Sequence, residues 1–197
     1  MLKNNQDYED QQFKQLSAEK EQFKGLYFED CHFIDCLFSE ATFERCQFNE
    51  CTFQNCDLSL TVWEGSSFQN GRFKHSKLIG VDWTRLTWSK YVKESPLRFE
   101  HCALDYGTFI GLSIQKQKMS SCSLKEVDFT EANLTGTVFD DCDLTGTQFR
   151  HTNCTKAQFQ TAKNYLINPK INDLTNAQFA LPEAVNLLHA MDIVISD

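Results

Sequence analysis

Large apolar side chains recur at every fifth position along most of this chain. Every Phe and Trp up to Trp88 has a residue number that leaves a remainder of three on division by five, and every Phe from Phe99 onward leaves a remainder of four. Leu, Ile, Met and Cys complete 14 consecutive units over residues 23–88 and 13 over residues 99–159. Because an α-helix repeats every 3.6 residues and a strand every two, neither element explains this period.

A second position in each unit prefers a small side chain. Two residues before each large apolar residue, which we call the centre, the chain places mostly Cys, Ala, Ser, Thr or Gly, and we call this the small position. Eight of the nine Cys lie there, and Cys154 is itself a centre. The other three positions of each unit are mostly polar, so we expect two of every five side chains to point inward.

The period predicts a square coil with four five-residue sides. Each unit forms one side and the next turns a corner, so about twenty residues complete a turn and the units form nearly seven coils. Coils stacked at the strand spacing of about 4.8 Å make a rod on the order of 30 Å long. Each buried Phe contributes about 1.5–3 kcal/mol, which explains how such a domain could be stable with few conventional helices and strands.

The units resemble those of a known family. Segments such as FEDCH-FIDCL, EANLT-GTVFD and DCDLT-GTQFR are similar to the A-(D/N)-L-x-x consensus of the pentapeptide-repeat family over about residues 23–163. The resemblance implies an all-β fold, a right-handed quadrilateral β-helix of about seven coils. Within the family, the Phe- and Cys-rich first half, the phase change and the C-terminal ending are most similar to the topoisomerase-protecting members, which are the Qnr quinolone-resistance, albicidin-resistance and microcin-immunity proteins.

The repeat divides the chain into three parts. Residues 1–22 are expected to form a lead-in or cap. Because Tyr8 and Phe13 share the first phase, a degenerate first coil that begins near Tyr8 is the alternative. Residues 23–163 are expected to form the coils, with a phase slip at 89–98. Residues 164–197 are expected to form a C-terminal cap and dimerisation segment.

The phase slip predicts a local irregularity of the rod. Trp88 and Phe99 are 11 residues apart instead of ten, and one inserted residue predicts a bulge or a small loop. Loops that project from the rod matter for gyrase protection in the resembling Qnr proteins, which implies a partner contact through Tyr91, Lys93 and Glu94. The alternative is a tolerated insertion without a partner.

The C-terminal segment predicts a short helix followed by a short strand. Pro182 is suited to the first turn of a helix, Leu187, Leu188 and Met191 share one helical face, and the apolar residues from Ile193 alternate. These apolar residues can cap the stack, but they are many for one terminus. Family members dimerise end to end through this region, so the resemblance implies a homodimer through the apolar residues Val185, Leu187, Leu188, Met191, Ile193 and Ile195.

The cysteines predict no metal site, disulfide framework or cofactor. Their spacing follows multiples of five, with no CxxC pair and no matching His pair. Such spacing is typical of a stacked interior, in which reduced Cys acts as a small apolar group. No nucleotide-binding, hydrolase or metalloprotease motif occurs, and carboxylate pairs such as Asp140 and Asp141 are expected on a convex surface without a pocket. An enzyme is therefore not expected.

The overall charge argues against a protein that holds nucleic acid directly. The 197 residues include 19 Lys and Arg against 27 Asp and Glu, a net charge of −8, whereas affinity for nucleic acids comes largely from cations on phosphates. The opening residues are polar and acidic, and no apolar run approaches about 18 residues, so neither a signal peptide nor a membrane helix is expected. We expect a cytoplasmic protein that contacts neither membranes nor nucleic acids.

Charge is distributed in zones along the sequence. Residues 29–60 and 126–149 are acidic and flank a basic belt at residues 70–101. A negative rod about as thick as duplex DNA can dock in a cationic groove, and the resemblance implies that this groove is the DNA-binding saddle of bacterial DNA gyrase or topoisomerase IV. The expected partner-binding carboxylates are Asp128, Glu131, Asp140, Asp141 and Asp143.

Together these features predict a non-enzymatic DNA mimic. It would bind the type II topoisomerase and protect it from a poison, such as a quinolone, albicidin or a microcin-like peptide, as an antibiotic-resistance or self-immunity protein. The alternative is a general protein-binding scaffold unrelated to topoisomerases.

Overall fold

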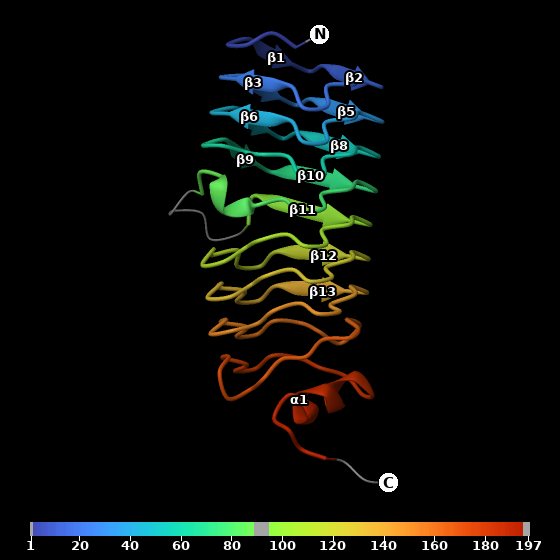
Figure 1. The fold of residues 1–197 in the computed structure, drawn as a ribbon, viewed down its shortest axis with the longest axis vertical. Helices are drawn as coiled ribbons and strands as arrows, with labels where there is room; N and C mark the ends of the chain where they lie inside the picture. The colour runs from blue at the N-terminus through green and yellow to red at the C-terminus, as the bar shows by residue number, and fades with distance from the viewer. Residues whose placement is uncertain (1, 89–94, 195–197) are drawn as a thin grey trace.

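The chain winds as a rod of stacked four-sided coils (Figure 1). The structure, a computed structural model, describes residues 2–88 and 95–194. Strands three or four residues long pair only in parallel, each with the strand one coil away. The expected fold class, an all-β solenoid with a short C-terminal helix, is confirmed.

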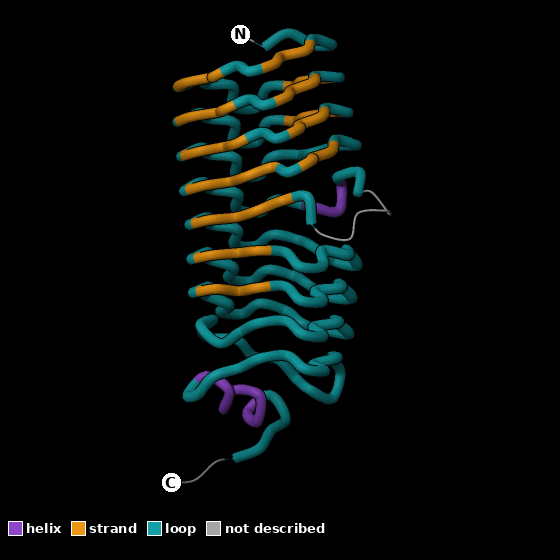
Figure 2. The backbone as a smooth tube through the Cα atoms, turned by 180° about the vertical axis from the view of Figure 1, so that it is seen from behind, coloured by secondary structure: helices purple, strands orange, loops and turns teal. Residues whose placement is uncertain are grey.

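The four sides of each coil form four faces of the rod, and three of them carry strands (Figure 2). Face 1 contains β1 (Asp7–Glu9), β4 (Tyr27–Glu29), β7 (Gln47–Asn49) and β9 (Ser67–Gln69). Face 2 is a seven-stranded sheet of β2 (Gln12–Lys14), β5 (His32–Ile34), β8 (Thr52–Gln54), β10 (Gly71–Lys74), β11 (Leu97–Glu100), β12 (Lys118–Ser120) and β13 (Val138–Asp140). Face 3 is held by isolated bridges such as Ser17 to Leu37, and face 4 contains β3 (Gln22–Lys24) and β6 (Thr42–Glu44).

The centres fill the interior of the rod as columns of stacked rings. Phe33 and Phe53 are register partners on face 2, with ring centroids 4.5 Å apart and planes 6° from parallel. Rings on neighbouring faces meet edge to face, as Phe28 and Phe33 do at 5.2 Å and 75°. Since parallel in-register pairing places like residues above each other, the five-residue period becomes four continuous apolar columns.

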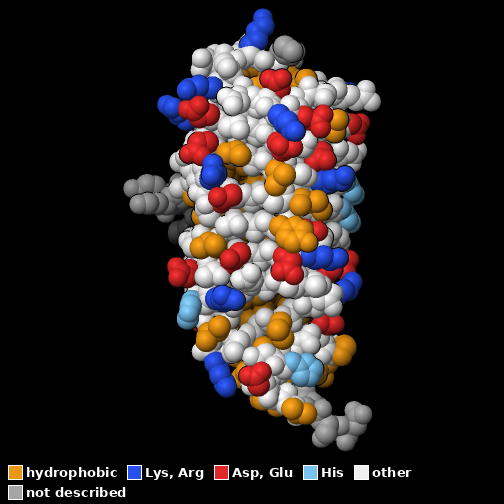
Figure 3. Space-filling model, viewed as in Figure 1, with side chains coloured by type: hydrophobic (Ala, Val, Ile, Leu, Met, Phe, Trp, Pro, Cys, Tyr) orange, Lys and Arg blue, Asp and Glu red, His pale blue; other side chains and the backbone are white. Residues whose placement is uncertain are grey.

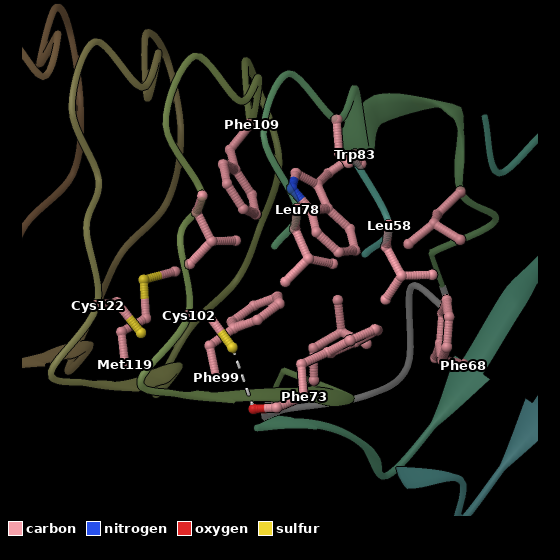
Figure 4. Close-up of a cluster of buried hydrophobic side chains, with 14 of the residues drawn as sticks. Leu58, Phe68, Phe73, Leu78, Trp83, Phe99, Cys102, Phe109, Met119 and Cys122 are labelled. Carbon is pink, nitrogen blue, oxygen red and sulfur yellow. Dashed lines mark hydrogen bonds between the residues drawn. The ribbon is translucent and has the colours of Figure 1, made fainter. Parts of the chain in front are cut away.

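The small positions are buried beside these columns, and their polar atoms bond to the backbone of the preceding coil. The Cys102 thiol donates to the Phe73 carbonyl oxygen at 3.3 Å (Figure 4). Ser66 and Thr147 donate in the same way to carbonyls 23 positions earlier, at 2.7 and 2.6 Å. A small donor is therefore suited to this position because it fits the crowded wall and adds a hydrogen bond between coils.

A left-handed backbone conformation turns each corner. The residue two after almost every centre, which we call the corner position, has a positive φ, from 49° at Asp141 to 70° at Gly146. Asp, Asn and Gly are suited to this conformation because they tolerate positive φ better than other residues. The corner side chains point outward and supply much of the surface charge.

The phase slip is a six-residue insertion. The register partners Phe53 and Phe73 are 20 positions apart, whereas Phe73 and Phe99 are 26 apart. The extra residues lie between Thr87, whose N–H still donates to Ser66 O, and Ser95, whose N–H donates to Gln115 O. The prediction of one inserted residue is therefore wrong, because an insertion of six changes a five-residue phase by the same amount as an insertion of one.

The coils extend beyond residues 23–163 at both ends. β1 and β2 pair with β4 and β5, so residues 7–14 belong to a coil rather than to a separate cap. At the other end, the bridge between Gln158 and Gln178 adds a further partial coil. Both additions follow from the phase of Tyr8, Phe13 and Phe179, which continue the two series of centres.

Two short 3-10 helices and one α-helix complete the described residues. The first, η1 (Trp83–Arg85), is capped by the Asp82 carboxylate, which accepts from the Thr84 N–H. At the C-terminal end, η2 (Glu183–Val185) leads directly into α1 (Asn186–His189). The predicted helix is therefore present but spans only residues 183–189, and the predicted strand is absent from residues 193–194.

Candidate functional site

Three of the predicted carboxylates gather at the corner between faces 2 and 3. Asp140 follows the centre Phe139, Asp141 occupies the corner position, and Asp143 begins the next side. The Thr161 hydroxyl, one coil further on, donates to Asp140 at 2.9 Å. The structure thus brings these three acids together, as their closeness in sequence required.

Lysines one coil away partly neutralise this corner. Lys163 Nζ lies 2.6 Å from Asp141 Oδ1, and this contact lowers the pKa of Asp141. Lys125 Nζ lies 3.3 Å from Asp143 Oδ2. Although partial burial alone would raise the pKa of Asp143, hydrogen bonds from Asn164 and Thr145 and the contact with Lys125 lower it to about 2. Two of the three acids at this corner, Asp141 and Asp143, are therefore paired with lysines.

The other two predicted carboxylates lie on a different face. Asp128 is half-buried on face 4 and accepts a hydrogen bond from the Thr130 N–H at 2.8 Å. Glu131 occupies the next corner, between faces 4 and 1, and is exposed. The five predicted carboxylates therefore form two separate groups. The predicted contacts Tyr91, Lys93 and Glu94 lie outside the described residues.

The structure reveals an acidic surface that sequence reasoning did not select. Three successive coils place carboxylates along face 1 and its corner with face 2, and we call this set the acidic stripe. Its members are Asp7, Glu9, Asp10, Glu29, Asp30 and Glu50. Of these, only Glu50 forms an ion pair among the described residues, with Arg72 at 3.9 Å. A repeat of acids every twenty residues (10, 30, 50) was the signal that could have identified it.

The acidic stripe has a charge density close to that of duplex DNA. Six carboxylates occupy three coils, which at about 4.8 Å each span about 14 Å of the rod axis. This is one negative charge per about 2.4 Å, compared with one per about 1.7 Å along duplex DNA. Elsewhere, as on the face in Figure 3, charged side chains of both signs are interspersed.

The C-terminal end exposes apolar side chains. Of the predicted interface residues, Val185, Leu187 and Met191 are half-buried, and Leu187 packs against the interior, whereas Leu188 and Ile193 are 38% and 44% exposed. Ile195 lies outside the described residues. Sequence reasoning missed three further exposed apolar residues toward this end of the chain, Leu166, Ile171 and Leu181. The segment therefore caps the stack with part of its apolar surface and leaves the rest open (Figure 3).

The interior thiols are shielded by the coils and differ in pKa: a hydrogen bond with the Cys56 thiol lowers the pKa of Cys36 to about 7. All nine Cys are buried and free. Burial raises the pKa of Cys154 and of Cys51 to about 12, so both thiols stay protonated at neutral pH. Among the described residues, no group of three His, Cys, Asp or Glu side chains is arranged to hold a metal ion.

A surface cavity of about 660 Å³ lies on face 1 where the chain enters and leaves the insertion. Its described lining combines amides and hydroxyls with Trp88 and Arg98. No His, Cys, Asp or Glu belongs to that described lining, so these side chains supply no general acid or base of those types. No helix in the described residues is long and apolar enough to cross a membrane.

Comparison with known sequences identifies one family in two parts of the chain. A pentapeptide repeat region model matches residues 26–109, and a model of eight pentapeptide repeats matches residues 128–163. Together they cover more than half of the chain and leave residues 110–127 between them. No curated protein matches this sequence significantly.

Solved structures share the rod architecture at low sequence identity. Trypsin-treated QnrB1, described as a plasmid-mediated fluoroquinolone resistance protein, is similar with a TM-score of 0.67 and 15% identity over 97% of each chain. Full-length QnrB1 gives a TM-score of 0.56 at 18% identity, over 95% of this chain and 100% of that one. HetL from Nostoc sp. strain PCC 7120, a pentapeptide repeat protein involved in heterocyst differentiation regulation, gives 0.60 at 15% identity over 90% and 88%. At such identities the likeness establishes the fold alone.

Proposed function

Because this chain belongs to the pentapeptide-repeat family, we propose that it is a non-enzymatic protein that binds a bacterial type II topoisomerase, DNA gyrase or topoisomerase IV, and protects it from a poison. The observation that carries the proposal is the acidic stripe, with its DNA-like density of carboxylates, of which only Glu50 forms an ion pair among the described residues. A cationic surface that binds DNA attracts such a stripe through the same long-range field. The fold shared with QnrB1 is consistent with this role.

In this mechanism the protein acts by occupying a surface rather than by chemistry. The rod presents a rigid line of carboxylates to the DNA-binding saddle, where it competes with DNA or displaces the poison from the cleavage complex. The corner acids Asp140, Asp141 and Asp143, with Asp128 and Glu131, extend the negative surface toward the C-terminal coils. We place the stronger contact at the acidic stripe, because its charges are largely free of internal partners.

The proposed form is a cytoplasmic homodimer joined end to end at the C-terminus. The proposed interface residues are Val185, Leu187, Leu188, Met191, Ile193 and Ile195. The exposed Leu166, Ile171 and Leu181 add apolar surface toward the same end of the chain. Burying such a surface in a second copy removes it from water. Two rods joined in this way would present two acidic stripes to a topoisomerase.

The proposal is tested by supercoiling assays with purified gyrase and topoisomerase IV. Each poison is titrated with and without the protein, and we expect at least one poison to need a higher concentration for the same inhibition. A variant with Asp10→Asn, Asp30→Asn and Glu50→Gln should lose most of this protection while keeping the fold, because Asn is well tolerated at positive φ. The matched control neutralises Asp140, Asp141 and Asp143 and should retain more protection.

Two results would contradict the proposal. If no poison is relieved and micromolar protein does not inhibit supercoiling, the topoisomerase role is wrong. If the control variant loses more protection than the stripe variant, the contact lies at the C-terminal corner instead.

A second candidate is a general protein-binding scaffold. The same rod architecture occurs in HetL, whose described role is in heterocyst differentiation regulation. Capture of a partner other than a topoisomerase, together with failure of every poison-rescue assay, would favour this alternative.

A further inference from the structure

Face 2 carries three exposed cations in register. Arg72, Arg98 and Lys118 occupy the same outward position of β10, β11 and β12, and each is the direct register partner of the next. We call these residues the basic ladder. Since neighbouring strands lie about 4.8 Å apart, the three charges form a line about 10 Å long.

The alignment is unfavourable within the rod itself. Like charges placed directly opposite each other on neighbouring strands are destabilising. Among the described residues, neither Arg98 nor Lys118 forms an ion pair, and Arg72 has only the 3.9 Å contact with Glu50. The same position holds no Lys or Arg on the preceding and following coils, where it is occupied by Gln12, His32, Thr52, Val138 and Gln158. The cations are thus confined to three coils, which points to an external partner.

The preceding three coils carry the opposite charge on the same side of the rod. Asp10, Asp30 and Glu50, part of the acidic stripe, occupy the corner between faces 1 and 2. The N–H of each donates to a carbonyl one coil further on, so these carboxylates also follow the pitch of the coils. We call them the acidic ladder. Acidic and basic ladders therefore have the same number of charges and the same spacing, and they follow each other along the rod.

This arrangement selects among the possible anionic partners. A long polyanion lying along face 2 would meet Asp30 and Glu50 at one end of the basic ladder and Asp140 and Asp141 at the other. An extended acidic peptide carries same-side carboxylates about 6.6–6.8 Å apart, two residues along the strand, which does not match the ladder. The acidic ladder of a second copy has the required sign, number and pitch.

We propose that two copies of this chain associate side by side and antiparallel through these ladders. A two-fold axis that passes between the coil of Glu50 and the coil of Arg72 relates the two copies. It places Asp10 of one copy opposite Lys118 of the other, and likewise Asp30 opposite Arg98 and Glu50 opposite Arg72. Each pair occurs twice, as a two-fold interface requires. The contact is separate from the C-terminal interface and does not depend on the proposed function. It covers part of the acidic stripe, so a laterally paired copy cannot present that stripe to another partner.

The expected association is weak and depends on salt. Exposed ion pairs each contribute little, and the Debye length falls from about 30 Å at 0.01 M salt to about 3 Å at 1 M. The lateral form should therefore grow with protein concentration at low ionic strength and disappear at high ionic strength. An apolar C-terminal dimer should persist at both, which separates the two interfaces.

The test uses opposite charge reversals in the full chain, followed by sedimentation velocity at low and high salt. One variant carries Arg98→Glu and Lys118→Glu, and the other carries Asp10→Lys and Asp30→Lys. Lys already occupies corner positions with positive φ at residues 20 and 156, so the second variant is compatible with the fold. The matched control carries Arg150→Glu and Lys156→Glu, two exposed cations without an ion pair among the described residues.

We expect neither reversed variant to self-associate laterally, whereas their equimolar mixture regains the salt-sensitive species and the control retains it. Far-UV circular dichroism checks the fold of each variant. If a charge-reversed variant unfolds, it is replaced by a neutral one, either Arg98→Gln with Lys118→Gln or Asp10→Asn with Asp30→Asn. Each neutral variant should also lose the association. Absence of a salt-sensitive species in the unaltered protein at about 100 μM, or a mixture that fails to associate, overturns the inference. Poison rescue is measured separately, so its failure does not decide this result.

Discussion

Replacing Phe33 by Ala should remove a large part of the stability of the rod. The ring is 1% exposed and stacks between Phe13 and Phe53, with centroid distances of 5.0 and 4.5 Å. It also meets the edges of Phe28 and Phe38 at 5.2 and 5.9 Å. The substitution therefore deletes a side chain that contacts aromatic rings above, below and on both sides.

The expected cost follows from burial and from the rigidity of the site. Buried Phe→Ala substitutions cost about 3–5 kcal/mol, and the cost is highest where the surroundings cannot collapse into the cavity. Here hydrogen bonds between the coils fix their spacing, so the coils cannot move closer to fill the cavity. Examples are His32 N–H to Gln11 O at 2.8 Å and Gln15 N–H to Ile34 O at 2.9 Å. We therefore expect about 4 kcal/mol, a large fraction of the 5–15 kcal/mol typical of a folded domain.

The matched control is Phe13→Ala in the same column. Phe13 is half-buried in the outermost coil, and along the column its ring stacks on Phe33 alone. Solvent reaches this site and the end coil can rearrange, so we expect a cost of about 1–2 kcal/mol. The comparison isolates the contribution of the enclosed position.

Equilibrium urea unfolding followed by far-UV circular dichroism and by Trp fluorescence measures both costs. Two probes are needed because stacked repeats can unfold in parts rather than as a single unit. If Phe33→Ala costs less than about 1.5 kcal/mol, or no more than Phe13→Ala, then the ring columns do not carry the stability and this reasoning is wrong.

Two further predictions concern the small position and the acidic corner. Cys51→Leu should cost about 1–3 kcal/mol through overpacking. Cys51→Ser should be almost neutral, because the Cys51 thiol lies 3.7 Å from Phe28 O and Ser66, at another small position, forms the same kind of hydrogen bond. Equal costs of the two substitutions in urea unfolding would contradict the crowding argument. Asp143→Asn should lower the free energy of unfolding at pH 7 by at most about 1 kcal/mol after solvent screening. Because the pKa of Asp143 is lowered to about 2, its contribution to stability is present above about pH 4 and is lost as the pH falls toward 2. The free energies of unfolding of the two proteins should therefore become equal near pH 2 in acid titrations of stability. A difference that persists at pH 2 would exclude this cause.

The five-residue period alone predicted which side chains would be buried. Phe28, Trp63 and Phe139 lie on the predicted phases, and each is 0% exposed. The small side chains at Cys36 and Cys142 were likewise expected inside and are 0% exposed. This works because the direction of a side chain in a square coil depends only on its position within its own unit, so no long-range information is required.

Contacts between coils depended on quantities that the period does not contain. Lys125 pairs with Asp143 across 18 positions, and Lys163 pairs with Asp141 across 22. Such pairs form only when the length of each coil and the position of each corner are known. For the same reason, the acids at residues 10, 30 and 50 were not recognised as one line of charge before the corners were located.

The primary structure determined the phase of every unit, the contents of the interior and the presence of a break after Trp88. Only the tertiary structure decided that the break contains six residues, because a five-residue phase cannot distinguish one inserted residue from six, whereas the hydrogen-bonded register of Phe73 and Phe99 can. The same register decided which charges lie side by side. Burial is thus encoded locally within each unit, while the charged surfaces depend on the pairing of residues about twenty positions apart.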